Sequence, residues 1–254
     1  MHHDTHTAIT DWAVSPSSTA VPYDFAVREM EQRAVMISEG RAAELIWLLE
    51  HPPIYTAGTS ANPGDLLDTD RFPIFKTGRG GQYTYHGPGQ QVIYVMLDVK
   101  RRFGDVRCFV SAMEAWMLDT LRSFEIEAIT HRDRVGVWVP VDAAGNHHFQ
   151  DDDQKTVTGI HTTEEKIAAI GIRLKRWVSF HGMSLNVDPD LSHFDGIVPC
   201  GITQYGTTSL NRLGRPNDRK AVQDALRRNF EIAFGPTRTC QAPPPADAIA
   251  SHLQ

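Results

Sequence analysis

Between residues 44 and 99, short apolar runs alternate with turns rich in proline and glycine. The run at 44–50 reads ELIWLLE and ends at His51-Pro52-Pro53, because proline fixes φ and lacks a backbone donor. Beyond the glycine-rich turns at 78–81 and 87–89, the run at 91–99 reads QVIYVMLDV. Apolar runs this short, bounded by turn residues, predict buried strands rather than helices. We therefore expect the chain to fold around a sheet.

Helices and further strands are predicted around this segment. The predicted helices are 27–37, 106–124 and 218–234, and the further strands are 54–56, 73–76, 136–139, 167–174 and 177–187. Strands and helices do not follow a strict βαβ alternation. The sequence therefore favours the α+β class, with a single domain built from a mixed, mostly antiparallel sheet packed with helices.

The 254 residues divide into one domain and less ordered ends. We expect a flexible polar leader at 1–20, a catalytic domain at 21–238 and a flexible tail at 239–254, where three consecutive prolines occur. Residues 140–165 are strongly polar and include the run Asp151-Asp152-Asp153, so we expect an exposed insertion there.

Composition excludes several classes of function. The formal net charge of −6 disfavours binding to nucleic acid or to an anionic membrane surface. No apolar run is long enough to span a bilayer, and the N-terminus does not resemble a signal peptide, so we expect a cytoplasmic protein.

Metal or cofactor binding is not predicted, because the three cysteines lack CxxC spacing and His147-His148 lack further ligands at suitable spacing. Cys108 and Cys240 are expected to be small buried apolar residues.

Three segments carry residues suited to chemistry. The glycine-rich stretch at 79–90 is either a structural hairpin corner or a place where a ligand approaches the backbone closely. Lys166 opens a small apolar run; it is either solvated or placed to favour a thiolate or to pair with an anionic ligand. Cys200 lies between proline and glycine, in a turn that either exposes its sulfur or packs it beneath a loop. The residues alone do not say which histidine or lysine would activate it.

In order along the chain, these segments resemble the lipoyl/octanoyl transferases of lipoate biosynthesis, within the biotin/lipoate protein ligase superfamily. The similar stretches are HPPIYTAG at 51–58, RGGQYTYHGPGQ at 79–90, KIAAIGIR at 166–173, RWVSFHGMSLNV at 176–187 and IVPCGI at 197–202. They extend over most of the region from about residue 44 to residue 210. Several long stretches in one order are far more specific than any single short motif.

The resemblance implies an acyltransferase with Cys200 as nucleophile and Lys166 as its partner. It implies transfer of an octanoyl group from octanoyl-acyl carrier protein to a lysine of lipoyl domains in 2-oxoacid dehydrogenases and the glycine cleavage H protein, through a thioester on Cys200. The residues that it implies for the acyl site are Arg79, Gly80, Gly81, Gln82, Tyr83, Thr84, Tyr85, His86, Ala169, Ile170, Gly171, Gly182, Met183 and Ser184. The biotin/lipoate protein ligase fold is expected with them.

The chemistry of these residues agrees with the resemblance. Exchange of one thioester for another is nearly balanced, which suits a thiol nucleophile, and passage from thioester to amide runs downhill without a nucleotide. Ile167, Ala168, Ala169 and Ile170 are small or apolar and suit one wall of an acyl tunnel. The basic clusters at 100–102 and 173–176 are candidates for contact with acidic acyl carrier protein.

Two other functions remain as alternatives. An ATP-dependent lipoate–protein ligase would share the fold and a lysine like Lys166, but it would not need a cysteine nucleophile such as Cys200. A non-catalytic protein that only holds acylated partners would need neither residue. Oligomeric state, the preferred acceptor and the strictness of selection for eight carbons are not indicated by the sequence.

Overall fold

The computed structural model describes residues 9–16, 18–141, 163–198 and 205–244. Within these ranges the strands are β1 (Thr10–Val14), β2 (Leu45–Leu49), β3 (Ile54–Ala57), β4 (Ile74–Lys76), β5 (Tyr83–His86), β6 (Gln90–Met96), β7 (Val137–Val141), β8 (Thr163–Lys175), β9 (Val178–Asn186), β10 (Gly206–Thr207) and β11 (Thr237–Cys240). The helices are α1 (Tyr23–Ser38), α2 (Val99–Arg102), α3 (Val106–Arg122) and α4 (Arg219–Phe234), with 3₁₀ turns η1 (Pro63–Asp65) and η2 (Leu191–Gly196).

Two sheets form the framework. The large sheet has the strand order β10-β8-β9-β6-β2-β1-β11, with β7 paired to β8, and the small sheet has the order β4-β3-β5. In the large sheet, β7, β8, β9, β6 and β2 run antiparallel to one another in that order, while β1 is parallel to both β2 and β11. The prediction of a single α+β domain with a mixed, mostly antiparallel sheet is confirmed.

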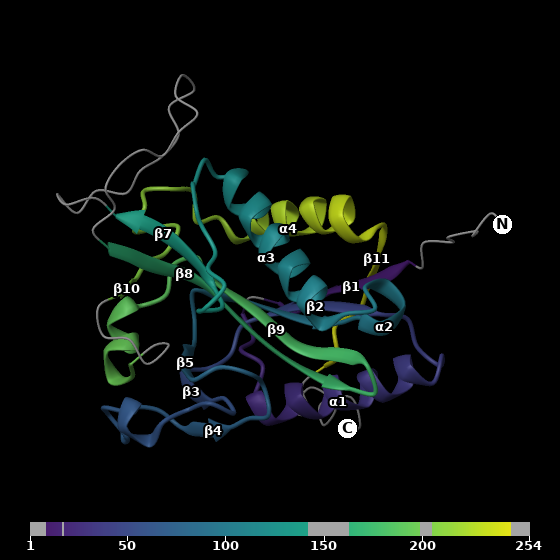
Figure 1. Ribbon diagram of the computed structural model, residues 1–254, viewed down its shortest axis with the longest axis horizontal. Coiled ribbons are helices and arrows are strands. Elements are labelled where there is room, and N and C mark those ends of the chain that lie inside the picture. Colours follow the sequence, from purple (N-terminus) through teal and green to yellow (C-terminus); the bar gives the residue numbers. More distant parts are fainter. Residues whose placement is uncertain (1–8, 17, 142–162, 199–204, 245–254) are drawn as a thin grey trace.

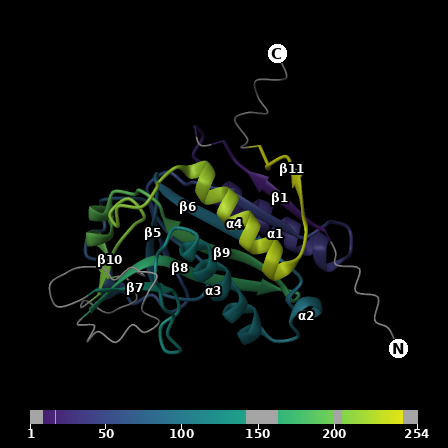
Figure 2. The ribbon, with the colours of Figure 1, turned by 90° about the horizontal axis from the view of Figure 1, so that it is seen from above.

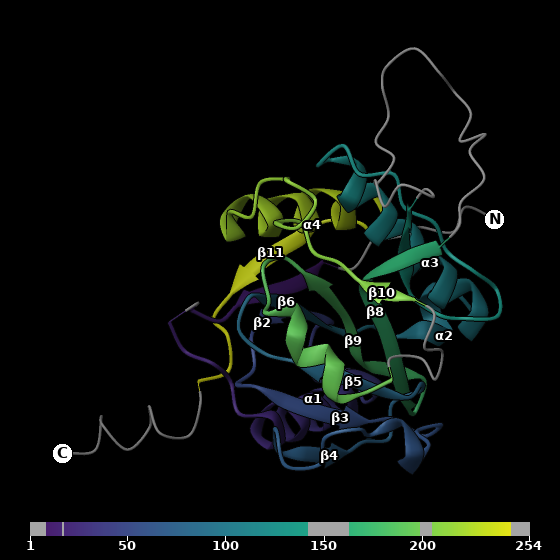
Figure 3. The same cartoon turned by 90° about the vertical axis from the view of Figure 1, so that its left-hand side faces the viewer.

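Helices cover both faces of the large sheet (Figure 1). Helices α3 and α4 lie over one face, where a large apolar cluster joins them to the sheet (Figure 2). Helix α1 lies on the opposite face over a second apolar cluster. The small sheet lies on the same side as α1, below β8 and β9 (Figure 3). Helices α3 and α4 therefore lie on one face of the large sheet, and α1 and the small sheet lie on the other.

Most predicted elements lie within two residues of their expected bounds, but α1 and β8 each begin four residues before the predicted start. The side chain of Asp105 accepts hydrogen bonds from the backbone N–H groups of Arg107 and Cys108, which stabilises the first turn of α3. Asp218 caps α4 in the same way through Ala221. The expected strand at 91–99 is shorter, because Val99 begins α2 and the Asp98 side chain caps that helix.

The expected leader at 1–20 is wrong for residues 10–14. Thr10–Val14 form β1, which is buried from Thr10 to Ala13 and pairs with two strands of the large sheet. The expected tail also begins too early, because Thr239 and Cys240 belong to β11. A short strand that pairs only with distant segments has no local sequence signal, so only its burial in the folded sheet reveals it.

Two further expectations need correction. Pro140 and Val141 end β7 and pair with Glu164 and Thr163 of β8, so the insertion is narrower than 140–165. Its remainder, with the acidic run and His147-His148, lies outside the described residues. Cys108 is exposed rather than buried, because it lies on the solvent side of α3, and Cys240 is half-buried.

Candidate active site

A cavity of about 380 Å³ is lined by residues of the two sheets, of α1 and α3, and of the segment 133–135. Ligand sites commonly have volumes of about 300–1,000 Å³. The predicted substrate-binding residues that line this cavity are Arg79, Gly80, Gly81, Gln82, Tyr83, Thr84, His86, Ala169, Ile170, Gly171, Gly182, Met183 and Ser184, and Lys166 lines it with them. The fold thus brings three segments that are distant in the sequence to one place.

All predicted substrate-binding residues lie in the described ranges, and Tyr85 is the one among them that does not line the cavity. Successive side chains of a strand point to opposite sides, so Tyr85 faces away from Thr84 and His86. It is fully buried, and its hydroxyl lies 2.8 Å from Nδ1 of His193. Tyr85 therefore belongs to the core of the small sheet.

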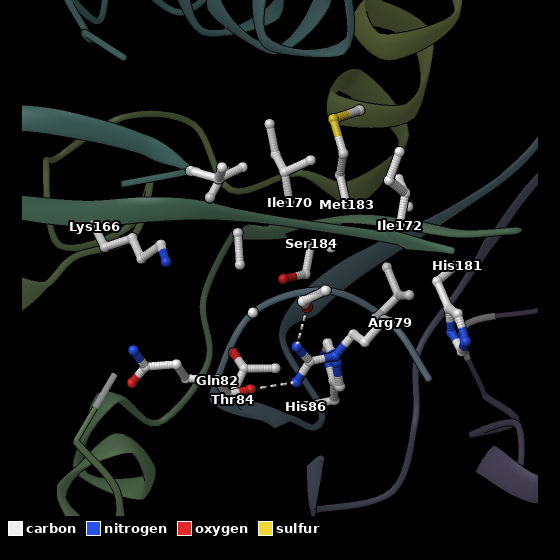
Figure 4. A pocket seen from close by; sticks show the side chains of 18 of the residues that line it. Arg79, Gln82, Thr84, His86, Lys166, Ile170, Ile172, His181, Met183 and Ser184 are labelled. Atoms are coloured by element: carbon white, nitrogen blue, oxygen red, sulfur yellow. Dashed lines mark hydrogen bonds between the residues drawn. The ribbon is translucent and has the colours of Figure 1, made fainter. Parts of the chain in front are cut away.

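The strand residues fill two roles. In Figure 4 Lys166 and Ser184 project to one side of β8 and β9, while Ile170 and Met183 project to the other. Ile170 and Met183 also belong to the apolar core against α3 and α4. Ile167 is buried in that core and is not among the residues that line the cavity, so its expected place in the tunnel wall is wrong.

Small residues on adjacent strands let the glycine-rich loop approach the large sheet closely. Ala169 is paired with Ser184, and Gly171 is paired with Gly182. A β-carbon at Gly171 would lie 3.1 Å from Cδ of Arg79, which is tighter than ordinary packing. Glycine at 171 therefore lets the arginine cross the strand closely.

Arg79 is a buried cation that holds the glycine-rich loop in place. Its Nη2 donates to the carbonyl oxygen of Thr56 at 2.8 Å, to the Thr56 hydroxyl at 2.7 Å and to the carbonyl oxygen of Gln82 at 2.9 Å. Bonds of a charged donor are stronger than neutral ones. In the described part of the chain, the buried Oε1 of Gln82 has no hydrogen-bond donor. Gln82 thus offers an acceptor at the cavity wall.

His51 and Tyr94 form a buried pair behind the cavity. Nδ1 of His51 lies 2.6 Å from the carbonyl oxygen of Val21, and Nε2 lies 2.5 Å from the Tyr94 hydroxyl. A carbonyl oxygen only accepts, so Nδ1 carries the proton and Nε2 accepts from Tyr94. Tyr94 lines the cavity, and this bond fixes its hydroxyl.

The protonation of His86 follows from a longer chain of hydrogen bonds. Nδ2 of Asn186 donates to the carbonyl oxygen of Thr208 at 3.0 Å, and Oδ1 of Asn186 accepts from Nε2 of Gln90 at 2.9 Å. Oε1 of Gln90 must therefore accept from Nδ1 of His86, 2.6 Å away. The neutral ring consequently has an unprotonated Nε2.

Burial keeps three histidines around the cavity neutral. Desolvation lowers the pKa of His51 to about 4 and the pKa of His86 to about 3. Burial, with the charge of Arg79 nearby, lowers the pKa of His181 to about 3. Lys166 and His181 lie on opposite sides of the pocket in Figure 4, with Arg79 between them. The Lys166 side chain and the neutral His181 ring therefore lie on opposite sides of Arg79.

Cys200, the predicted nucleophile, lies outside the described residues. The described chain on either side of it is anchored. The N–H of Val198 donates to the carbonyl oxygen of Asp65 at 2.7 Å. Beyond Cys200, Thr207 of β10 pairs with Lys166, and the N–H of Thr208 donates to the Lys166 carbonyl oxygen at 2.9 Å. The chain that carries Cys200 thus continues into a strand beside Lys166.

Several cavity residues were missed from the sequence. These are Tyr23, Ser60, Gln90, Val92, Tyr94, Val110, Asp133, Arg134, Val135, Ile172, His181, Asn186, Phe194 and Thr207. Ala168, which was expected in the tunnel wall, does line the cavity. His181 stands directly before Gly182 in the stretch RWVSFHGMSLNV, so that stretch contained a signal for it. Tyr23, at the start of α1, had no such signal, because its segment lies outside every similar stretch.

Other site types find no support in the described ranges. No group of three metal-binding side chains occurs among residues 9–16, 18–141, 163–198 and 205–244. No helix in the same ranges has the length and apolar character needed to cross a bilayer.

Known proteins similar to this chain identify its class. The model of the lipoyl protein ligase A/B catalytic domain matches residues 22–231. An octanoyltransferase of Caulobacter vibrioides is 55% identical over 232 residues, which cover 91% of this chain and 95% of the relative. An octanoyltransferase of Dinoroseobacter shibae is 56% identical over 226 residues, which cover 89% and 97%.

Solved structures agree with the fold. The bipartite lipoate protein ligase of Thermoplasma acidophilum has a TM-score of 0.61 at 13% identity, covering 97% of this chain and 91% of that one. Lipoate-protein ligase A bound with ATP has a TM-score of 0.60 at 14% identity, covering 97% and 93%. At these identities the likeness shows the fold alone.

The chain belongs to the lipoyl protein ligase A/B catalytic domain family, since the family model matches most of its length. Within that family it is an acyltransferase of the octanoyltransferase kind, as the relatives at 55–56% identity indicate.

Proposed function

We propose that the chain transfers an octanoyl group from octanoyl-acyl carrier protein to a lysine of lipoyl domains, through a thioester on Cys200. The acceptors are the E2 subunits of 2-oxoacid dehydrogenases and the glycine cleavage H protein, and the reaction takes place in the cytoplasm as the first step of endogenous protein lipoylation. The observation that carries the proposal is the cavity that gathers Lys166 with the glycine-rich loop and the small residues of β8 and β9. The octanoyltransferases at 55–56% identity support the acyl group.

The reaction has two half-reactions that balance without a nucleotide. The Cys200 thiolate attacks the carbonyl carbon of the carrier thioester, and the carrier thiolate leaves and takes up a proton. The amine of the acceptor lysine then attacks the octanoyl-Cys200 thioester; an amide forms, the amine loses a proton and the Cys200 thiolate leaves. Covalent catalysis of this kind divides one difficult transfer into two easier steps.

Lys166 supports the first half-reaction through its charge. A free thiol has a pKa of about 8.5 and is mostly protonated at neutral pH. A nearby ammonium group favours the thiolate and makes the sulfur a better nucleophile. Lys166 faces the cavity from β8, beside the strand that follows Cys200. The proposed nucleophile and its partner are thus linked by the pairing of β10 with β8.

The cavity walls suit an acyl chain. Ala169, Gly171 and Gly182 present small surfaces on adjacent strands, next to Val92 of β6. Burial of a methylene group contributes about 0.8 kcal/mol, so an eight-carbon chain gains several kcal/mol. The same dependence on length allows the cavity to discriminate modestly between acyl chains that differ by one carbon.

The basic clusters predicted to contact acyl carrier protein form ion pairs within this chain, which weakens the case for that contact. Arg102 is largely buried and forms an ion pair with buried Glu44. Lys175 pairs with Glu31 at 3.3 Å, and Arg176 pairs with Glu39 at 3.0 Å. These cations are partly neutralised by neighbours, so the proposal for the carrier protein as donor does not depend on them.

The ATP-dependent ligase is not favoured. The two lipoate–protein ligase structures named above are 13% and 14% identical to this chain, whereas the two octanoyltransferases are 55% and 56% identical. Transfer from octanoyl-acyl carrier protein is accordingly expected without added ATP or magnesium. Strict dependence on both would support the ligase instead.

The test of the covalent mechanism is intact-protein mass spectrometry after mixing with octanoyl-acyl carrier protein. We expect the wild type to gain one octanoyl group that hydroxylamine removes, and Cys200→Ala to gain none. Cys108→Ala is the matched control, since it removes an exposed thiol and should leave the adduct intact. Active wild-type enzyme without an adduct would contradict the thioester.

A second prediction concerns the charge of Lys166. In a background lacking Cys108 and Cys240, Lys166→Ala should move the pH profile of Cys200 alkylation to higher pH, because the thiolate loses a neighbouring cation. Lys166→Arg, which keeps the positive charge, is the comparison. Identical profiles for Lys166→Ala and the parent would show that Lys166 does not tune the sulfur.

A further inference from the structure

Lys166 lies against a buried aromatic ring on the neighbouring strand. Trp138 of β7 and Lys166 of β8 are direct partners across the antiparallel pair. Nζ of Lys166 lies 5.0 Å from the centre of the Trp138 ring, a distance at which an ammonium group is attracted to an aromatic face. Trp138 is 1% exposed, so its ring is fixed by packing. The ring therefore offers Lys166 a rigid surface beside the cavity.

Gly136 leaves the space through which the lysine passes. Its φ of +140° is a conformation that favours glycine, and a β-carbon there would lie 2.6 Å from Cε of Lys166. The same β-carbon would lie 3.3 Å from Nζ and 3.1 Å from the carbonyl oxygen of Ala168. Any side chain at position 136 must therefore displace Lys166 or the strand that carries it.

Trp138 is held by charged and aromatic neighbours. Cζ of Arg134 lies 4.7 Å from the centre of the Trp138 ring and 4.1 Å from the centre of the Tyr205 ring. The rings of Trp138 and Tyr205 are 5.4 Å apart, with an interplanar angle of 63°. Arg134 is in turn ion-paired with Glu164, which also contacts His131 at 3.0 Å. The orientation of Trp138 is thus determined by several contacts.

We propose that Trp138 and Gly136 are positioning residues for Lys166, and that Arg134 positions Trp138. The inference rests on the proposed function, in which Lys166 acts on the reacting thiol. A lysine side chain has many rotamers in solution, and the ring and the glycine restrict them so that the ammonium stays at the cavity. Small errors in the placement of a catalytic group slow a reaction strongly.

The test is a double-mutant cycle on the single-turnover rate of Cys200 octanoylation, followed by quenched mixing and intact mass spectrometry. We expect Lys166→Ala to slow this step about 100-fold and Trp138→Leu to slow it about tenfold. In the double variant, Trp138→Leu should add nothing to Lys166→Ala, because its effect passes through the lysine. A further tenfold loss in the double variant would overturn the inference.

Matched variants separate positioning from folding. Trp116→Leu also removes a fully buried tryptophan, from the core between α3 and α4, and should leave the octanoylation rate unchanged. Gly136→Ala should slow the step about tenfold, because the lysine is displaced. Gly104 also has a positive φ, but a β-carbon there would meet no described atom within 4 Å, so Gly104→Ala should not slow the step. Equal octanoylation rates for Gly136→Ala and Gly104→Ala would contradict the role of Gly136.

The same measurements separate the positioning of Lys166 from the proposed role of Lys166 in the reaction. An unchanged rate in Lys166→Ala would overturn both the role of Lys166 and its positioning. If Lys166→Ala slowed octanoylation while Trp138→Leu reacted at the wild-type rate, only the positioning role of Trp138 would be overturned. If Trp138→Leu fails to fold, the double-mutant cycle is measured with Gly136→Ala and Lys166→Ala instead, and the same two outcomes support or overturn the positioning of Lys166.

Discussion

At the scale of single residues, Gln90 is the link on which the orientation of His86 depends. Gln90→Leu removes the acceptor for Nδ1 of His86 and the donor for Oδ1 of Asn186. A buried polar group without a partner costs about 1–3 kcal/mol, so the loss of two partners should lower the free energy of unfolding by about 2–6 kcal/mol. Nitrogen-15 NMR should show neutral His86 with its proton on Nδ1 in the wild type, and a loss of this preference in the variant.

The control for this prediction is Gln223→Leu. Gln223 is half-buried and donates one hydrogen bond, to Oε1 of buried Gln91, so its loss leaves one buried group without a partner and should cost about half as much as Gln90→Leu. Equal destabilisation by the two variants, measured by urea unfolding, would contradict the importance of the Gln90 link. A wild-type proton on Nε2 of His86 would contradict the deduced chain of hydrogen bonds.

The same scale shows how far motifs predict a site. The stretch at 79–90 gave the loop and the strand that meet the cavity, but it did not say which face each side chain occupies. Tyr85 alternates away from Thr84 and His86 and lies in the core, so membership in the stretch was misleading for that residue. His181 lies within the stretch at 176–187, but only Gly182, Met183 and Ser184 of that stretch were predicted as site residues.

At the scale of elements, β11 determines whether β1 has a neighbour on its outer side. A chain ending after Gly235 loses the parallel pairing of β11 with β1 and the contacts of Arg238 with Asp11. Each lost hydrogen bond contributes about 1 kcal/mol, so we expect a loss of several kcal/mol in the free energy of unfolding. A chain ending after Pro244 keeps β11 and should match the full chain in urea unfolding. Equal stability of both truncated chains would show that β11 is dispensable.

The elements that were predicted and those that were missed differ in how local their signals are. The helix at 106–124 has apolar residues at helical spacing, and strands β8 and β9 follow each other in a hairpin, so local patterns suffice. Strand β1 has five residues, and its partners β2 and β11 begin about 35 and 227 positions away along the chain. No periodicity within such a short segment can report a pairing made across the whole fold.

At the scale of the whole molecule, the cavity is a product of assembly. Its lining comes from both sheets, from α1 and α3 and from the segment 133–135, whereas the family resemblance covered β5, β8 and β9. The packing of α1 against the sheet, which brings Tyr23 into contact with His51 at 5.3 Å between ring centres, is a long-range result that no single stretch encodes. The neutral histidines are likewise a consequence of the burial that this assembly creates.

These histidines make the stability of the entire fold depend on pH. Their pKa values are about 4, 3 and 3 in the folded protein, whereas an unfolded histidine has a pKa near 6.5. Below pH 6.5 the unfolded chain therefore binds more protons than the folded one. Stability is fully present above pH 6.5 and falls as the pH decreases toward the folded pKa values, by up to about 1.4 kcal/mol per pH unit for each histidine.

His51→Gln isolates one of these contributions. Glutamine can donate to the carbonyl oxygen of Val21 and accept from the Tyr94 hydroxyl, but it does not titrate. Urea unfolding between pH 7 and pH 5 should show a pH dependence that is about one proton smaller in the variant than in the wild type, because one neutral buried imidazole is gone. Parallel curves for the two proteins would mean that His51 does not exchange its proton on unfolding, and that other groups cause the acid sensitivity of the fold.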